Sequence, residues 1–259
     1  MRVGYISDLH IDFNDRHDLF TPLVNEYKKN NLELLLIGGD TSSSIKKSKK
    51  FMNDLIHSGV NAYIIFGNHE FYELENSVQE DHDSVDSFPL LIGCSGVIAD
   101  TGWYDYTWLM QGSLWAAKRG KTPFSSRTWP DHRFINWGDK DQEWFVDYVM
   151  QNMERQNKEL DDIAVCNKII MTHMVPHYWL LEKDPAYLST NVFFGGEHLS
   201  EFVNRVEPKY CLFGHTHFVR DEIKDGVHYI SRPVGYCSYE WGNDSAQDRV
   251  ERMLYVFEV

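Results

Sequence analysis

The chain has 259 residues, of which 42% are hydrophobic, so it can bury a full core as one large domain or two small ones. Its formal net charge of −14 opposes nonspecific binding to nucleic acid or to an anionic membrane. The sequence has neither a membrane-spanning apolar stretch nor the apolar core of a signal peptide at its N-terminus, so we expect a cytoplasmic protein that does not act at a membrane.

No fixed-period repeat, low-complexity tract or Pro/Gly/Ser-rich linker divides the sequence. We therefore expect one domain over residues 1–259, with a Trp-rich insertion or lid at about 71–160. The four cysteines are widely separated and lack C-x-x-C spacing. This pattern favours reduced thiols that serve as small core residues over a disulfide scaffold or a metal site.

Five short apolar runs have the length and composition of buried strands. They span Arg2–Ser7, Glu33–Gly38, Asn61–Phe66, Lys168–Thr172 and Lys209–Phe213. Amphipathic helical patterns at residues 19–27 and 51–56 separate the first three runs. This alternation predicts parallel strands that are joined by right-handed crossovers.

The pattern changes after Gly67. Further strands are predicted at Ser95–Asp100 and Trp103–Trp108, a helix at Asp139–Asn157, and hairpin-like strands at Val227–Ser231 and Arg252–Val259. The elements together predict an α/β fold with a layered β-sandwich core flanked by helices, in which the later strands join or form a second sheet. The order of the strands does not follow from the sequence.

Each of the five apolar runs is followed by side chains of a type that binds metals. They are Asp8 and His10, Asp40, Asn68 and His69, His173, and His215 and His217. Each short motif alone is weak evidence, because a solvated turn or a hydrogen-bonded histidine is the commoner explanation. A core has no need of such residues at the end of every buried strand, however, and burying them unpaired costs several kcal/mol. Since the carboxyl ends of strands in α/β sheets lie together, metal binding explains all five motifs at once.

The order D-x-H, G-D, G-N-H-E, H and G-H-x-H, from Asp8 to His217, resembles the signature of the calcineurin-like metallophosphoesterases. The resemblance implies two metal ions, divalent or of mixed valence, with Asp40 as the bridging ligand. One ion would be held by Asp8, His10, Asp40 and His217, and the other by Asp40, Asn68, His173 and His215. Mixed nitrogen and oxygen donors favour manganese, iron, zinc or cobalt over calcium or magnesium.

The resemblance also implies an enzyme, a metal-dependent phosphoric ester hydrolase. The expected reaction is the attack of a metal-bound hydroxide on a phosphodiester or a small phosphomonoester, so the expected partner is a phosphorylated small molecule. His69 would be the catalytic residue, stabilising the phosphoryl oxygens or protonating the leaving alkoxide. A role for His69 that is limited to orienting a ligand stays open.

Two other functions stay open. The same site could serve a nuclease acting on DNA or RNA, although the acidic charge and the lack of a long basic stripe disfavour nucleic acid. The basic cluster from Lys118 to Arg133 has the composition of a solvated loop, but it would bind a second phosphate or a nucleotide backbone if it folded over the metals. A catalytically inactive interaction scaffold is disfavoured because no ligand of the motif set is missing. A phosphoprotein phosphatase is disfavoured because Thr41 and Ser42 replace the D-R-G continuation of that group. The sequence does not indicate an oligomeric state.

Overall fold

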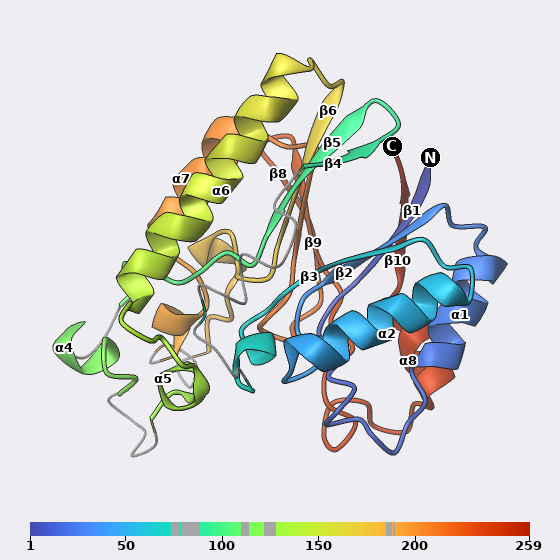
Figure 1. Ribbon diagram of the computed structural model, residues 1–259, viewed down its shortest axis with the longest axis horizontal. Helices are drawn as coiled ribbons and strands as arrows, with labels where there is room; N and C mark the ends of the chain where they lie inside the picture. Colours follow the sequence, from blue (N-terminus) through green and yellow to red (C-terminus); the bar gives the residue numbers. More distant parts are fainter. Residues whose placement is uncertain (74–77, 79–88, 110–113, 122–127, 185–187, 189) are drawn as a thin grey trace.

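The computed structural model describes residues 1–73, 78, 89–109, 114–121, 128–184, 188 and 190–259. In this part of the chain two β-sheets stack face to face, and helices cover the outer face of each sheet (Figure 1). The predicted α/β fold with a layered, helix-flanked sheet core is therefore confirmed.

The first sheet has the strand order β10-β1-β2-β3. Its strands are β1 (Arg2–Ile6), β2 (Leu34–Gly38), β3 (Ala62–Ile65) and β10 (Tyr255–Glu258). The first three strands are parallel, as predicted, while β10 runs antiparallel to β1. Helices α1 (Phe20–Lys29), α2 (Ile45–His57) and α8 (Ala246–Met253) lie together on the outer side of this sheet (Figure 1).

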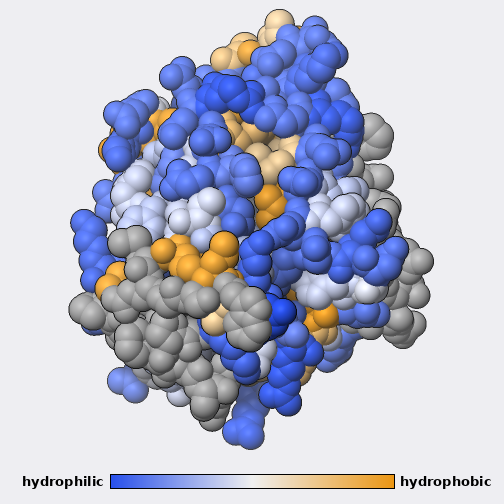
Figure 2. Space-filling model, turned by 90° about the vertical axis from the view of Figure 1, so that its left-hand side faces the viewer, coloured by the Kyte–Doolittle hydropathy of each residue, from blue (hydrophilic) through white to orange (hydrophobic). Residues whose placement is uncertain are grey.

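The second sheet has the strand order β4-β5-β6-β7-β9-β8. Its strands are β4 (Leu90–Ile92), β5 (Ser95–Asp100), β6 (Asn167–Thr172), β7 (Tyr210–Phe213), β8 (Arg220–Lys224) and β9 (Val227–Ser231). The four inner strands are parallel, and the two edge strands are antiparallel to their neighbours. Helices α6 (Gln142–Asp162) and α7 (Glu197–Val206) cover the outer face. Their layer presents a largely hydrophilic surface, with hydrophobic side chains gathered toward its middle (Figure 2).

Short helices complete the described chain. They are α4 (Leu114–Ala117), α5 (Pro130–Phe134), and the 3₁₀ turns η1 (His69–Phe71), η2 (Tyr178–Leu180) and η3 (Asn191–Phe193). Among the described helices, none is long and apolar enough to cross a membrane.

Apolar side chains form three layers, one between the sheets and one beneath each group of helices. The layer between the sheets contains Val3 and Leu36 from the first sheet and Val97 and Met171 from the second. The Tyr5 hydroxyl crosses this layer and donates to the Phe213 carbonyl oxygen at 2.7 Å. The two sheets, and the loops that follow their strands, are thus held in a fixed relation by a dry core.

Each of the five apolar runs forms a strand, with ends that lie within one residue of the predicted ends. The strand predicted at Trp103–Trp108 is wrong, because this segment is a buried irregular loop in which Tyr106 has a φ of 63°. The segment Arg252–Val259 begins with the end of α8, and only Tyr255–Glu258 forms a strand, which pairs with β1. The hairpin partner of β9 is the unpredicted strand β8.

The cysteine prediction holds only in part. Cys211 is buried, and Cys237 is half-buried, but Cys94 and Cys166 are exposed. These two precede the paired strands β5 and β6, and the Cys166 N–H donates to the Cys94 carbonyl oxygen at 2.7 Å. They are therefore surface neighbours rather than core residues.

Candidate metal centre

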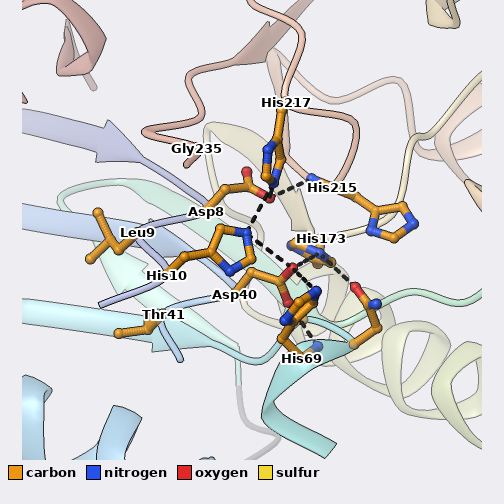
Figure 3. Close-up of polar contacts among 12 residues, drawn as sticks. Asp8, Leu9, His10, Asp40, Thr41, His69, His173, His215, His217 and Gly235 are labelled. Carbon is orange, nitrogen blue, oxygen red and sulfur yellow. Dashed lines mark hydrogen bonds and ion pairs between the residues drawn. The ribbon is translucent and has the colours of Figure 1, made fainter. Parts of the chain in front are cut away.

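The predicted ligands meet at the carboxyl ends of β1, β2, β3, β6 and β7 (Figure 3). Asp40 lies at the centre of the group, with its Oδ2 3.3 Å from His173 Nε2 and 3.7 Å from His10 Nε2. Across the site, the Nε2 atoms of His10 and His217 are 3.0 Å apart. Side chains that are more than 200 residues apart in the sequence are thereby brought into contact.

Two sets of three side chains, with no residue in common, have geometry that could hold a metal ion. Within each set, the possible ligand atoms lie within 4.8 Å of one another; the sets are Asp8, His10 and His217, and Asp40, His173 and His215. The amide oxygen of Asn68 extends the second set, since it lies 3.2 Å from His173 Nε2. Each set contains three of the four ligands predicted for one ion, and Asp40 of the second set also lies 3.7 Å from His10 of the first.

His69 lies beside these sets and is only partly buried. Its Nε2 is 3.9 Å from Asp40 Oδ2, and its side chain is 15% exposed toward the pocket described below. His69 also forms a possible three-residue ligand group with His10 and Asp40. The geometry therefore suits a residue that contacts a substrate next to the ions, and it also permits direct coordination.

The residues present fit metal ions. Asp8 and His10 are fully buried, and Asp8 Oδ2 has no hydrogen-bond partner among the described residues. A buried carboxylate oxygen without a donor is strongly unfavourable, and a cation between Asp8, His10 and His217 would compensate it. The mixture of carboxylate, imidazole and amide donors suits transition-metal ions better than calcium or magnesium.

The chain turns sharply as it leaves each strand. Asp8, His10, Asp40, His215 and His217 all have positive φ values, between 44° and 72°. The chain also approaches the ligands closely: a Cβ atom on Gly67 would lie 2.1 Å from Asp40 Oδ1 and 2.7 Å from His173 Cδ2 and Nε2. A glycine is therefore required at position 67 if Asp40 and His173 are to keep these positions.

Glu70 holds two of these loops together. Its buried carboxylate accepts the backbone N–H groups of Asp40, Thr41, Ser42 and Gly67, and the Ser48 hydroxyl. Burial and the nearby Asp40 carboxylate raise the pKa of Glu70 to about 8, while the hydrogen bonds from Gly67, Ser42 and Ser48 act in the opposite direction. The motif G-N-H-E contains this residue, but sequence reasoning gave it no role.

Backbone carbonyls and Glu240 orient the histidine rings. His173 Nδ1 lies 2.9 Å from the Gly38 oxygen, which leaves Nε2 to face Asp40. His217 Nδ1 lies 3.0 Å from both carboxylate oxygens of Glu240, and Nε2 then faces Asp8 at 3.5 Å. Such outer partners fix the ring that a metal ion binds. Glu240 was not predicted, because it lies in a polar loop that follows no strand in the sequence pattern.

Burial and neighbouring charges shift the pKa values of Asp40, His173 and His215. Burial favours a neutral His173, but the Asp40 carboxylate outweighs it and raises the pKa of His173 to about 10. Burial and the neighbouring His173 lower the pKa of His215 to about 3. Burial opposes ionisation of Asp40 as well, yet His173 and His69 hold its pKa well below the usual range. Asp40 is therefore an anion at neutral pH.

An open pocket of about 700 Å³ lies over the site. Aromatic residues make up much of its described lining, namely Tyr72, Trp129, Phe194, Phe218, Tyr236 and Tyr239. Arg249 also borders it, but its guanidinium donates to the carbonyl oxygens of Val234, Pro233 and Glu240. The pocket has room for an organic group in addition to a phosphate.

The basic cluster contributes no side chain to the described lining of this pocket. Lys118 pairs with Glu143, Lys121 donates to Thr128, and Arg133 lies over the Phe134 ring. Arg127 lies outside the described residues.

The sheets and the site together define a metal-dependent phosphoesterase. A model of the calcineurin-like phosphoesterase family matches residues 1–219, and the chain belongs to this family. The family resemblance predicted from the strand-end motifs is thereby confirmed.

Known relatives extend over nearly the whole chain. An uncharacterized protein of Acanthamoeba polyphaga mimivirus is 25% identical over 272 residues, which cover 92% of each chain. The phosphopantetheinyl hydrolase of Mycobacterium tuberculosis has a TM-score of 0.70 at 16% identity, covering 98% of this chain and 95% of its own. A dimetal phosphatase from Danio rerio has a TM-score of 0.55 at 14% identity, covering 91% and 88%. At these identities the likeness of the two structures establishes a shared fold.

Proposed function

We propose that the chain is a dinuclear metal-dependent phosphoesterase that hydrolyses a phosphodiester or a small phosphomonoester. The observation that carries the proposal is the convergence of seven side chains from five strand ends, with Asp40 at their centre. In this proposal one ion is held by Asp8, His10, Asp40 and His217, and the other by Asp40, Asn68, His173 and His215. Membership of the phosphoesterase family supports the reaction class.

The ions and the side chains have different roles in the proposed reaction. The two ions, when bound, supply a nucleophilic oxygen at neutral pH and bind the phosphoryl oxygens. Asp40 would be the ligand common to both ions. His69 contacts the phosphoryl group from the open side, where it stabilises charge or protonates the leaving oxygen. The aromatic walls of the pocket receive the organic part of the substrate.

A panel of assays tests this function against its alternatives. The purified protein is first analysed for bound metal, and is then supplied with Mn²⁺ and a chromogenic phosphodiester, a phosphomonoester, single-stranded DNA or a phosphopantetheinylated protein. The last substrate is included because the M. tuberculosis hydrolase shares the fold over almost the full length of both chains. Activity on either small ester supports the proposal. Activity on DNA alone would favour a nuclease, and bound metals without any activity would favour a scaffold.

The role of His69 is tested by His69→Asn. If His69 acts on the substrate, turnover should fall by about 10²–10⁴-fold, the usual contribution of a general acid or base, while both ions stay bound. Turnover and metal content are measured on the same preparation. Loss of an ion from the variant would instead identify His69 as a ligand, as its position beside His10 and Asp40 permits.

A further inference from the structure

Asp131 reaches the candidate metal centre from the Trp-rich region. It lies in the short helix α5, far from the motifs in sequence, and is fully buried. Its Oδ1 accepts the Asn68 Nδ2 at 2.8 Å and the Tyr72 hydroxyl at 2.6 Å, and its Oδ2 accepts the Trp129 indole N–H at 3.0 Å. These three donors, which belong to the described part of the chain, are all uncharged.

The contact with Asp131 determines which end of the Asn68 amide faces the ions. An ionised carboxylate only accepts hydrogen bonds, so Asp131 pairs with the NH₂ group and turns the amide oxygen toward His173 Nε2, 3.2 Å away. The Tyr72 hydroxyl favours the same orientation of the Asn68 amide, because it accepts from Asn68 Nδ2 at 2.8 Å while it donates to Asp131. A flipped amide would place its oxygen against the carboxylate.

We propose that Asp131 is a positioning residue of the metal centre, which holds the Asn68 oxygen toward the ion and increases the electron density on that oxygen. The second effect follows because a carboxylate that accepts the amide N–H polarises the amide, as outer carboxylates do for metal-bound histidines. The inference rests on the proposed function, since it requires Asn68 to be a ligand. It gives the segment from Trp129 to Asp131 a part in metal binding.

The experiment measures the affinity of each ion by calorimetric titration of the metal-free protein with Mn²⁺. Asp131→Leu removes both acceptor oxygens and keeps the branching at Cγ, and we expect the affinity for one of the two ions to fall about 10–100-fold while the other changes little. Asp131→Asn keeps one acceptor oxygen and should give a smaller loss at the same ion. This second variant carries the test should Asp131→Leu fail to fold.

Two control variants separate this role from general stability and charge. Val149→Ala weakens the apolar layer beneath α6 and α7, in which Val149 is fully buried. Asp141→Asn removes the charge at the start of α6 but keeps a residue that can cap this helix. Both should bind the two ions as the wild type does. An Asp131→Leu protein that unfolds at a lower temperature but binds both ions as tightly as the wild type would overturn the inference alone. A wild-type protein that binds fewer than two ions would overturn the proposed function, and the inference with it.

Discussion

Asp8, His10, Asp40, His215 and His217 occupy a region of backbone conformation that most side chains avoid. Aspartate and histidine enter this region more readily than branched residues, but a non-glycine residue there still costs about 1–3 kcal/mol. Five such residues in one site indicate that the loops are shaped for metal coordination rather than for stability. The surrounding sheets hold this conformation in place.

Asp8→Asn should show that the buried Asp8 carboxylate lowers the stability of the metal-free protein. Burial raises the pKa of Asp8, so the carboxylate destabilises the folded metal-free protein as the pH rises above the usual aspartate range. An asparagine keeps the acceptor for the His215 N–H and tolerates the positive φ. We expect the metal-free variant to be more stable than the wild type at pH 7, with the difference vanishing toward pH 4.

Urea denaturation in the presence of a chelator measures this difference across the pH range. The same variant should lose the stabilisation that Mn²⁺ gives to the wild type. Equal stability of the two metal-free proteins at pH 7 would contradict the expected penalty of the buried Asp8 carboxylate.

The raised pKa of His173 predicts that a proton is released when metal binds. Its pKa of about 10 in the metal-free protein means that the ring is protonated at pH 7, and a metal ion must displace that proton. Metal affinity should therefore rise with pH up to about 10. Calorimetry in buffers of different protonation enthalpy counts the released protons. His177→Gln is the matched control, because His177 contacts Tyr229 outside the site and should leave the count unchanged.

At the scale of the elements, the glycine that follows β3 sets the distance between loops. Gly67→Ala places a Cβ against Asp40 and His173, so we expect metal affinity to fall by more than about tenfold, in line with a displaced ligand. Gly59→Ala serves as a control, because its Cβ meets no atom within 4 Å but its φ of 90° strains the backbone. That variant should lose stability yet bind Mn²⁺ normally in a metal titration.

The sequence predicted the structure correctly where one short apolar run corresponds to one strand. The apolar runs that end at Ile6, Gly38 and Phe213 are short, uninterrupted and followed by polar ligands, so both the parallel strands and the convergence of their ends could be predicted. The aromatic segment from Trp103 to Trp108 has strand composition, yet tertiary packing buries it as irregular backbone.

Other features carried no local signal. The strand β8 is largely charged and exposed at a sheet edge, where a hydrophobic alternation is absent. Glu240 and Asp131 gain their roles only from contacts with residues that are distant in the sequence. The positive φ values of the ligands likewise follow from the packing of the loops, not from residue type.

For the whole molecule, metal binding is linked to stability. An ion that binds only the folded state at about 100 times its dissociation constant stabilises it by about 2.7 kcal/mol. For a chain of this size we expect Mn²⁺ to raise the midpoint of thermal unfolding by about 5–10 °C. Asp40→Asn, which alters the residue proposed to bind both ions, should abolish most of the increase. A calorimetric scan with and without Mn²⁺ measures it, and an unchanged midpoint in the wild type would contradict a saturated site.

The pairing of β10 with β1 has a consequence for how the molecule avoids self-association. β1, whose end delivers Asp8, is an inner strand solely because Tyr255–Glu258 covers one of its sides. Without that cover, its row of free backbone amides and carbonyls would become a template for strands of other molecules. Loss of a few residues remote from the metal ligands in sequence would therefore produce fibrous or amorphous deposits before it produced a weaker enzyme.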